Sequence, residues 1–356
     1  PGCTETIVKP ILEKSGLLSG KDFYLAYSPE RVDPGNKDFD NIDIPKVVGG
    51  DGLEALNLST ALYSRVFSSI VPVASMEVAE ATKLTENIFR SGNIALVNEL
   101  KLIFSEMGLD IWEVIEAAGT KPFGFMPFYP GPGLGGHCIP IDPYYLKWRA
   151  LQFGVDTKFI ELAGEINTEM PGKIVERVSS CVRELLNTDI VSTRPLLVGL
   201  AYKKNVDDVR ESPSLSILKK LELLGAKVDF FDSYVTKIPV TREYSDLAGR
   251  ESIEWSVSNI SKYQLAIICT DHDGVNYQEI VDNVSLVFDT RNVLERHRNL
   301  GAGKALLNAS REHARDQGAS RLDLETETNN QIAQSLYEKL GYQKDTDFFK
   351  YSLELE

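Results

Sequence analysis

Short apolar runs alternate with helical stretches at the start of the chain. A helix is predicted over Thr4–Lys14, because apolar side chains recur on one face and Gly16 follows its end. The apolar runs predict three short buried strands, at Phe23–Tyr27, Lys46–Val48 and Ile70–Ala74. Strands separated by helices are typical of α/β domains. We therefore expect residues 1–75 to be a remnant of such a domain, with its closing strands but not its opening ones.

The next stretch is helical. Helical periodicity runs unbroken from Met76 to Met107 and ends at Gly108, which is long enough for a spine between two domains or for a dimer contact. We expect a homodimer through residues 76–107. Further helices are predicted around a Gly/Pro-rich loop, at Ile111–Ala118, Tyr144–Phe153 and Phe159–Met170. Together they predict an all-helical central domain over residues 76–170.

Alternating strands and helices return in residues 171–295. Four apolar runs predict strands, at Arg194–Ala201, Lys227–Phe231, Leu265–Thr270 and Ser285–Asp289. A helix over Ser214–Leu224 separates the first two and ends at Gly225. Strand, helix and strand at this spacing predict parallel pairing with right-handed crossovers. We expect a second α/β domain here.

The pattern changes again after about Arg296. Residues 301–317 and 330–340 have helical periodicity, whereas residues 321–325 and 348–355 have strand character. We treat residues 296–356 as a separate, partial α/β segment.

Composition narrows the choice of partners. The 356 residues are 43% hydrophobic and 25% charged, as in globular proteins. A net charge of −14 disfavours a general nucleic-acid or anionic-membrane surface. The four cysteines lie far apart, without a metal-binding spacing, so we expect no metal site. With no signal peptide and no apolar run of spanning length, we expect a cytoplasmic protein with free thiols. The first residue, Pro1, indicates a fragment or a processed chain.

The loop Phe128–Pro143 contains a formal G-x-G-x-x-G at Gly131, Gly133 and Gly136. A dinucleotide fingerprint needs a strand before it and a helix that opens at its last glycine. No such strand precedes these glycines, and we expect Pro140 and Pro143 to prevent a smooth helix start. We therefore reject a dinucleotide-binding function for this loop.

The loop is better explained as a support for the thiol of Cys138. Its glycines allow the backbone to pass close to a ligand. The alternative is a buried structural cysteine, which is the usual state of a free cysteine and the one we expect for Cys181 and Cys269.

The segment FYPGPGLGGHCIPIDPYYL, which contains Cys138, resembles the catalytic loop of the nucleotide-sugar (UDP-glucose/GDP-mannose) 6-dehydrogenases. Within that family it is most similar to the UDP-N-acetylhexosamine branch, which serves polysaccharide biosynthesis. Further segments resemble the family in the same order, at Tyr27–Val32, Lys83–Asn87, Ala201–Asn205 and Asp208–Pro213. The resemblance runs from Pro1 to about Asn292. It implies a Rossmann-like N-terminal domain and a Rossmann-like UDP-binding domain around the helical one.

The resemblance implies a four-electron oxidation of a sugar C6 hydroxyl to an acid, with two NAD used in turn. Cys138 is then the nucleophile that forms the thiohemiacetal and thioester. Lys83 and Asn87, one helical turn apart, stabilise an oxyanion. Asp142 holds the lysine and a water, and Glu30 handles the hydrolytic water, for which a raised pKa is an advantage. Without the resemblance, a solvated helix face is the default explanation for Lys83 and Asn87. For Asp142 the alternative is a turn aspartate before Pro143, and both roles can hold together.

Substrate contacts are implied at six positions, which are Arg31, Tyr129, Gly135, Tyr202, Lys203 and Arg291. Tyr202 and Lys203 match an aromatic–lysine pair that contacts the nucleotide and phosphate. The guanidinium of Arg291 suits a diphosphate or sugar hydroxyls. Arg31 and Tyr129 replace residues of the glucose-specific branch, which favours UDP-N-acetylhexosamine as the substrate.

The family's dinucleotide fingerprint is absent from this sequence. We therefore expect weak NAD binding and little or no turnover by this chain alone. A non-catalytic remnant that still binds a nucleotide sugar is the corresponding alternative.

The tail has its own glycine pattern, R-x-x-G-x-G at Arg298, Gly301 and Gly303, at the head of a predicted helix. Such a loop presents backbone N–H groups to a pyrophosphate. Together with residues 333–342 it resembles the second half of a GNAT acetyltransferase. The resemblance implies acetyl-CoA binding, with Asn330 on the cofactor side and Tyr337 as general acid. A merely structural helix–strand connection is the alternative.

Overall fold

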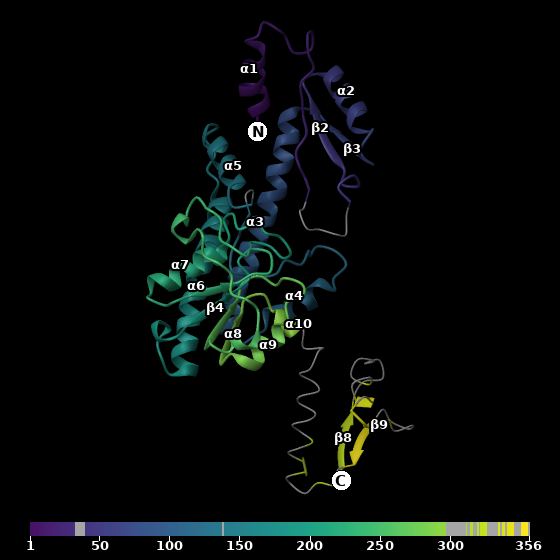
Figure 1. Cartoon of the computed structure of the whole chain (residues 1–356). Helices are drawn as coiled ribbons and strands as arrows, with labels where there is room; N and C mark the ends of the chain where they lie inside the picture. The colour runs from purple at the N-terminus through teal and green to yellow at the C-terminus, as the bar shows by residue number, and fades with distance from the viewer. Residues whose placement is uncertain are drawn as a thin grey trace. The chain divides into compact units, whose positions relative to one another are not determined.

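The computed structural model describes residues 1–32, 40–136 and 139–296, and in the rest of the chain residues 311, 314–315, 319, 321–325, 334, 337–338, 340–344 and 350–354 (Figure 1). The chain divides into two compact units, Pro1–Arg291 and Asn292–Glu356.

The first elements form a small sheet with helices. The helical turns η1 (Thr4–Val8) and α1 (Lys9–Glu13) follow each other directly, which confirms the predicted N-terminal helix. The sheet has the order β1-β2-β3, and β1 (Ala26–Tyr27) is antiparallel to β2 (Lys46–Gly50), which is parallel to β3 (Ile70–Val73). Helix α2 (Leu53–Tyr63) connects β2 to β3. The predicted strands are confirmed in position, although the first is shorter than expected.

The carboxylate of Glu80 fastens the N-terminal helical run to the long helix. Its oxygens accept hydrogen bonds from the backbone N–H groups of Gly2, Cys3 and Thr4 and from the Thr4 hydroxyl. The pKa of Glu80 lies below its usual value. Burial raises it, but the bonds from Thr4 and the two preceding N–H groups outweigh that effect.

The long helix α3 (Met76–Glu106) confirms the predicted spine. Ser75 caps its start by accepting a hydrogen bond from the N–H of Val78, and Gly108 follows its end with a φ of +70°. Helix α4 (Ile111–Gly119) is capped by Asp110 and packs its buried side chains against Val97 of α3.

Two predictions about the following helices are wrong. Helix α5 (Asp142–Leu151) begins smoothly with Pro143 in its first turn, where proline needs no helical N–H partner. Helix α6 (Lys158–Leu186) does not end at Met170 but continues through Pro171. Buried side chains lie on both sides of this proline, so packing outweighs the lost backbone bond. The boundary predicted between residues 170 and 171 therefore falls inside a helix.

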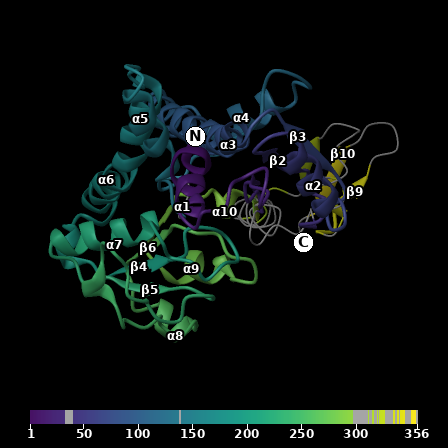
Figure 2. The ribbon, with the colours of Figure 1, turned by 90° about the horizontal axis from the view of Figure 1, so that it is seen from above.

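Helix α6 packs against α3 and α5 and also against α7 (Pro213–Leu223) (Figure 2). The strand order of the second sheet is β5-β4-β6-β7, and all pairs are parallel, as predicted. These strands are β4 (Pro195–Val198), β5 (Asp229–Phe231), β6 (Leu265–Ile268) and β7 (Leu286–Asp289). The shorter connections contain η2 (Ile190–Ser192), η3 (Ser245–Leu247), α8 (Val257–Ile260) and α9 (Tyr277–Asn283).

The strands of this sheet end in register. Val198 pairs with Phe231 and with Ile268, and Ile268 pairs with Asp289. The loops that follow the strands therefore emerge together at one edge, where parallel sheets place ligand sites.

The second unit begins with α10 (Val293–Arg296) and contains an antiparallel sheet in the order β8-β10-β9. The strands β8 (Arg321–Glu325) and β10 (Lys350–Glu354) confirm the predicted ones, and β9 is Gln343–Lys344. Within the described part of the chain, no helix has both the length and the apolar character to cross a bilayer.

Candidate active site

The glycine-rich loop is anchored at both ends. The N–H of Gly131 donates to Oδ1 of Asn98 at 3.0 Å, and the N–H of Gly136 donates to the carbonyl of Arg210 at 2.9 Å. Gly136 has a φ of +85°, which favours glycine. Cys138, like His137 before it, lies outside the described residues, and the description resumes at Ile139.

The glycines bring this loop into close contact with the second α/β domain. A Cβ atom on Gly135 would lie 2.5 Å from Cβ of Tyr202, and one on Gly131 would lie 2.6 Å from Nη1 of Arg291. A side chain at either position would have to displace its neighbour. Three of the predicted substrate residues, Gly135, Tyr202 and Arg291, are thus brought together along the segment that leads to Cys138.

Arg291 lies two residues after the end of β7. Its N–H donates to Asp289 at 2.8 Å, and its Nε donates to the buried Asp271 at 3.2 Å. Burial lowers the pKa of Lys101 on α3, an effect that Asp289 opposes and Arg291 reinforces. Asp271 therefore holds the guanidinium through Nε, and Asp289 holds the backbone of Arg291. A guanidinium has further N–H donors, which suit an anionic ligand.

Asn87 and Asp142 meet although 55 residues separate them. Nδ2 of Asn87 donates to Oδ2 of Asp142 at 2.6 Å, and Asn87 is only 4% exposed. Lys83 lies half-buried one turn earlier on the same face of α3. The helix face predicted from sequence is therefore turned toward the start of α5, just after the thiol loop.

Glu30 differs from the expectation. Its carboxylate is exposed and accepts hydrogen bonds from the N–H groups of Arg31 and Val32, each at 2.8 Å, while Lys46 lies 3.6 Å away. Burial raises the pKa of Glu30, but the Val32 N–H, the Lys46 ammonium and the Arg31 N–H outweigh it. The net pKa is lowered, so Glu30 does not have the raised pKa that would be an advantage for its implied role.

Arg31 joins this loop to α3. Its Nη1 donates to the carbonyl of Pro45 at 2.6 Å, and its Nη2 lies 2.7 Å from Oε1 of Glu86. Glu86 directly precedes Asn87, so the loop carrying Glu30 lies beside the helix face of the candidate site. Tyr129 instead stacks on Trp112, with ring centroids 5.4 Å apart and an interplanar angle of 13°. Lys203 is half-buried beside Tyr202.

Sequence reasoning missed a buried amide network that supports the loop. Nδ2 of Asn98 donates to Oδ1 of Asn167 at 3.1 Å, and Nδ2 of Asn167 donates to the carbonyl of Ser91 at 3.0 Å. All three residues are buried. A signal was available, because Ser91 and Asn98 continue the polar stripe of Asn87 along an otherwise apolar helix face.

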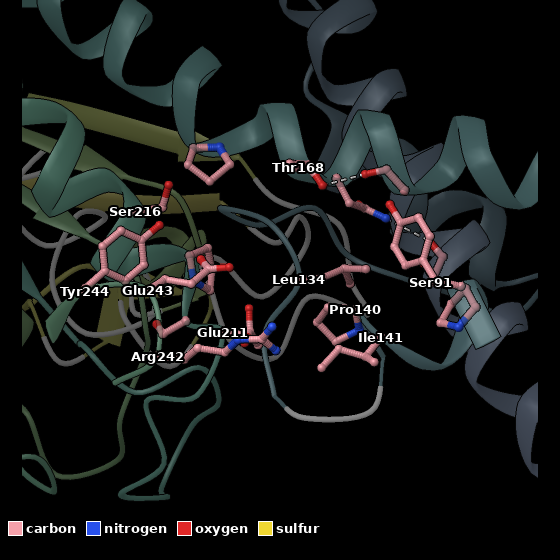
Figure 3. A pocket seen from close by; sticks show the side chains of 17 residues that line it. Ser91, Leu134, Pro140, Ile141, Thr168, Glu211, Ser216, Arg242, Glu243 and Tyr244 are labelled. Atoms are coloured by element: carbon pink, nitrogen blue, oxygen red, sulfur yellow. Dashed lines mark hydrogen bonds between the residues drawn. The ribbon is translucent and has the colours of Figure 1, made fainter. Parts of the chain in front are cut away.

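A cavity of about 430 Å³ lies on another side of the loop (Figure 3). Leu134, Pro140 and Ile141 face it from the loop, and Arg242 and Tyr244 line it from the second α/β domain. Its described lining residues include none of the predicted catalytic or substrate residues. We therefore assign it no part in the proposed chemistry.

The described N-terminal elements contain no G-x-G-x-x-G turn between a strand and a helix. The strand-to-helix turn after β2 is rich in glycine, but a Cβ on Gly49 would lie 2.3 Å from the carbonyl oxygen of Ser75. A Cβ on Gly50 would lie 2.3 Å from the backbone nitrogen of Leu56. These two glycines therefore allow close packing of the end of β2 against the start of α3 and against α2.

The structure describes only one of the residues predicted to bind acetyl-CoA in the tail. Arg298, Gly301, Gly303 and Asn330 lie outside the described residues. Tyr337 is described and lies beside Tyr342, with ring centroids 6.0 Å apart.

Three family models match the chain. Residues 77–169 match the central domain of the UDP-glucose/GDP-mannose dehydrogenase family, and residues 196–296 match its UDP-binding domain. Residues 292–342 match the acetyltransferase (GNAT) family.

Curated relatives agree with the first two models. The chain is 40% identical over 247 residues to a UDP-N-acetyl-D-glucosamine 6-dehydrogenase of Pseudomonas aeruginosa, covering 68% of this chain and 58% of that protein. It is 35% identical over 303 residues to protein CapL of Staphylococcus aureus, covering 83% and 69%. It is 32% identical over 300 residues to a UDP-N-acetyl-D-mannosamine dehydrogenase of Pyrococcus horikoshii, covering 83% and 67%.

Among solved structures, the UDP-D-ManNAc dehydrogenase of Pyrococcus horikoshii superposes with a TM-score of 0.71 at 31% identity, covering 82% of this chain and 66% of that one. An NDP-N-acetyl-D-galactosaminuronic acid dehydrogenase of Methanosarcina mazei superposes with a TM-score of 0.69 at 28% identity, covering 82% and 64%. The order of the matched domains, the fold and these identities agree, and the chain belongs to the UDP-glucose/GDP-mannose dehydrogenase family.

Proposed function

We propose that this chain carries the thiol and the nucleotide-sugar site of an NAD-dependent UDP-N-acetylhexosamine 6-dehydrogenase. The reaction converts the C6 hydroxyl to a carboxylate in two oxidations, for polysaccharide biosynthesis in the cytoplasm. The observation that carries the proposal is the packing of the thiol loop against Tyr202 and Arg291. Relatives named for UDP-N-acetyl-D-glucosamine and UDP-N-acetyl-D-mannosamine support this substrate class. NAD enters the proposal from the family alone, since the described residues contain no G-x-G-x-x-G turn between a strand and a helix.

Cys138 performs the covalent chemistry. Its thiolate adds to the C6 aldehyde and forms a C–S bond, giving a thiohemiacetal. After the second oxidation, water attacks the resulting thioester, the C–S bond breaks, and the acid and the free thiol are released. The sugar thus stays attached to the protein between its aldehyde and acid states.

Lys83 and Asn87 stabilise the oxyanion that forms when the thiolate or water adds to the carbonyl. One N–H of the Asn87 amide is held by Asp142 at 2.6 Å, which fixes the orientation of the other. Asp142 is therefore a positioning residue for Asn87 in addition to its proposed role toward Lys83 and a water.

Glu30 orients the hydrolytic water. Its lowered pKa keeps it ionised at neutral pH, so it accepts a hydrogen bond from the water and assists as a base rather than as an acid.

Tyr202, Lys203 and Arg291 bind the nucleotide diphosphate, and Arg31 and Tyr129 select the N-acetylated sugar. Titration calorimetry of the full chain with UDP and with UDP-N-acetylglucosamine tests this assignment. Lys203→Ala should weaken UDP binding by about tenfold, the equivalent of one charge-assisted hydrogen bond. Lys237→Ala is a control, because Lys237 is exposed beside Glu251 on another loop. No UDP binding by the parent chain would contradict the proposal, and UDP-sugar binding without an adduct between Cys138 and the 6-aldehyde would favour a non-catalytic binding protein.

A second function is favoured by one observation, the GNAT match of residues 292–342. We propose that the tail binds acetyl-CoA through Arg298, Gly301, Gly303 and Asn330, with Tyr337 as general acid of an N-acetyltransferase. Calorimetry with acetyl-CoA tests it, and loss of binding in Gly303→Glu is expected because a carboxylate there would repel the pyrophosphate.

We also propose that α3 forms a homodimer contact. Val78, Phe89, Leu96 and Ile103 are 44%, 50%, 51% and 46% exposed. Their spacings of 7 and 11 residues place them on one stripe of the helix. A second copy that presents the same stripe would bury both.

A further inference from the structure

The loop between β4 and α7 carries Tyr202 and Lys203. It also contains two residues in the left-handed region that favours glycine, Asn205 with a φ of +61° and Glu211 with a φ of +51°. Such conformations persist only where surrounding contacts hold them. The contacts that hold this loop come from the ends of β5 and β6.

Asp232 follows β5 and is 2% exposed. One carboxylate oxygen accepts hydrogen bonds from the N–H groups of Leu200 and Ala201, at 2.6 and 2.9 Å. The other accepts from the N–H groups of Tyr234 and Val235, at 2.8 and 2.9 Å. A carboxylate with this many N–H donors is held in its ionised form. It fixes the first residues of the loop.

His272 follows β6 and links Asp232 to Asn205 in the middle of the loop. Its Nε2 lies 3.0 Å from Oδ2 of Asp232, and its Nδ1 lies 3.0 Å from the backbone nitrogen of Asn205. A backbone N–H can only donate, so Nδ1 must carry no proton, and the proton on Nε2 is donated to Asp232. The two contacts together specify the neutral Nε2–H tautomer.

The two aspartates that flank His272 in the sequence make their contacts with other residues. Asp273 accepts a hydrogen bond from Nδ2 of Asn205 at 2.6 Å and pairs with Lys204 at 2.7 Å. Asp271 pairs with Arg291 at 3.2 Å. The ring of Tyr234 covers the imidazole at 4.9 Å between centroids. Asp232 is thus the carboxylate that meets the ring nitrogen directly.

Tyr202 and Lys203 lie in the loop between the residues that Asp232 holds and Asn205, which His272 holds. They are the pair proposed to bind the nucleotide. The carbonyl of Ala201 accepts from the Thr270 hydroxyl at 2.6 Å, and the N–H of Tyr202 donates to the carbonyl of Asp208 at 3.0 Å. Tyr202 in turn lies against Gly135 and Gly136, directly before the thiol. A shift at Asn205 would therefore be transmitted to Tyr202 and to the thiol loop.

We propose that His272 is a positioning residue, which holds Tyr202 and Lys203 against the thiol loop by accepting the Asn205 N–H at Nδ1 while donating to Asp232 from Nε2. The inference rests on the proposed function in one respect, the binding of UDP by Tyr202 and Lys203. It assigns a role in substrate affinity to a buried histidine that is distant from Cys138 in the sequence.

Two variants separate the two contacts of the ring. In His272→Asn, the side-chain oxygen can replace Nδ1 as the acceptor for Asn205. In His272→Gln, the terminal amide can replace Nε2 as the donor to Asp232, but the acceptor for Asn205 is lost. If the histidine only fills buried space, both variants should behave alike.

The measurements are UDP affinity by calorimetry and backbone amide exchange of the peptide containing residues 200–206, both on the full chain. We expect His272→Gln to weaken UDP binding by about tenfold, the equivalent of one lost hydrogen bond, and to accelerate exchange at Asn205. His272→Asn should retain most of the affinity and the slow exchange. Nitrogen NMR of the parent should show one histidine fixed as the Nε2–H tautomer, a signal missing from both variants.

Equal affinity and equal exchange in the parent and His272→Gln would overturn the inference, as would an Nδ1–H tautomer in the parent. A parent chain that does not bind UDP would instead contradict the proposed function. In that case amide exchange and the tautomer still decide whether His272 holds the loop. If His272→Gln does not fold, the tautomer of the parent and exchange in His272→Asn decide the outcome.

Discussion

Asn98 is fully buried, yet its side chain satisfies polar groups from two other parts of the chain. It accepts from Gly131 in the thiol loop and donates to Asn167 in α6. Buried polar groups cost little when all their hydrogen bonds are made and much when one partner is removed. At the scale of single residues, one amide therefore anchors the first end of the loop.

Replacing this amide with a side chain of similar volume should be costly. Asn98→Leu leaves the Gly131 N–H and the side-chain Oδ1 of Asn167 without their partner. We therefore expect a loss of about 2–4 kcal/mol in the free energy of unfolding. Urea denaturation measures it. Asn93→Ala is the matched control on the same helix, because Asn93 bonds only to the carbonyl of Phe89 near the surface, and its effect should stay within about 0.5 kcal/mol. Equal effects of the two variants would contradict the role given to Asn98.

Glu80 should give stability a pH dependence. Its pKa is lower in the folded chain than the ordinary value of 4.5, because the bonds from Thr4, Gly2 and Cys3 outweigh burial. The stabilisation is therefore present above the unfolded-state pKa and is lost as pH falls through the lower, folded-state pKa. Glu80→Gln should be less stable than the parent at pH 7, and the difference should shrink on acidification below about pH 4. A difference that is constant between pH 7 and pH 3 would contradict this assignment.

At the scale of elements, the thiol loop and the loop after β4 fit together only because Gly135 has no side chain. The space for a Cβ at that position is occupied by Tyr202, 2.5 Å away. Neither loop can keep its path if a side chain is added there.

Gly135→Ala should therefore weaken UDP binding by at least about tenfold, since the alanine displaces either Tyr202 or the loop. Calorimetry measures the change. Gly119→Ala at the end of α4 is the control, because nothing lies within 4 Å of a Cβ there. Unchanged UDP affinity in Gly135→Ala would show that Tyr202 does not take part in nucleotide binding.

Helices and strands that are marked by caps, glycines or apolar runs could be predicted from the sequence. Contacts between residues far apart in the sequence could not. A serine cap and a terminal glycine define α3, and apolar runs define β4, β6 and β7. The predicted end of α6 at Met170 is wrong, because the helix continues through Pro171. The packing of side chains on both sides of this proline cannot be inferred from the local sequence. Likewise, a sequence shows neither that Gly131 bonds to Asn98 nor that Val32, Arg31 and Lys46 lower the pKa of Glu30.

At the scale of the whole molecule, the exposed stripe of α3 predicts the oligomeric state. Leu96→Glu would place a charge in the middle of the proposed dimer contact, which is costly in an apolar interface. Analytical ultracentrifugation should show a dimer for the parent and a monomer for this variant. Val240→Glu is the control, since Val240 is 82% exposed and far from α3 in sequence. A monomeric parent at micromolar concentration would contradict the dimer.

The covalent role of Cys138 is the central claim, and the rate of alkylation of each cysteine tests it most directly. The full chain is treated with iodoacetamide alone, with UDP-N-acetylglucosamine, or with the corresponding 6-aldehyde, and each cysteine peptide is followed by mass spectrometry. Cys3 and Cys181 are internal controls, and Cys269 should stay unreactive because burial raises its pKa to about 12.

We expect the 6-aldehyde to slow alkylation of Cys138 well beyond the protection given by UDP-N-acetylglucosamine, because the thiohemiacetal occupies the sulfur itself. The rates at Cys3 and Cys181 should not change. If Cys138 is alkylated equally fast with the aldehyde and with the alcohol, its sulfur does not add to the sugar, and the proposed mechanism is wrong.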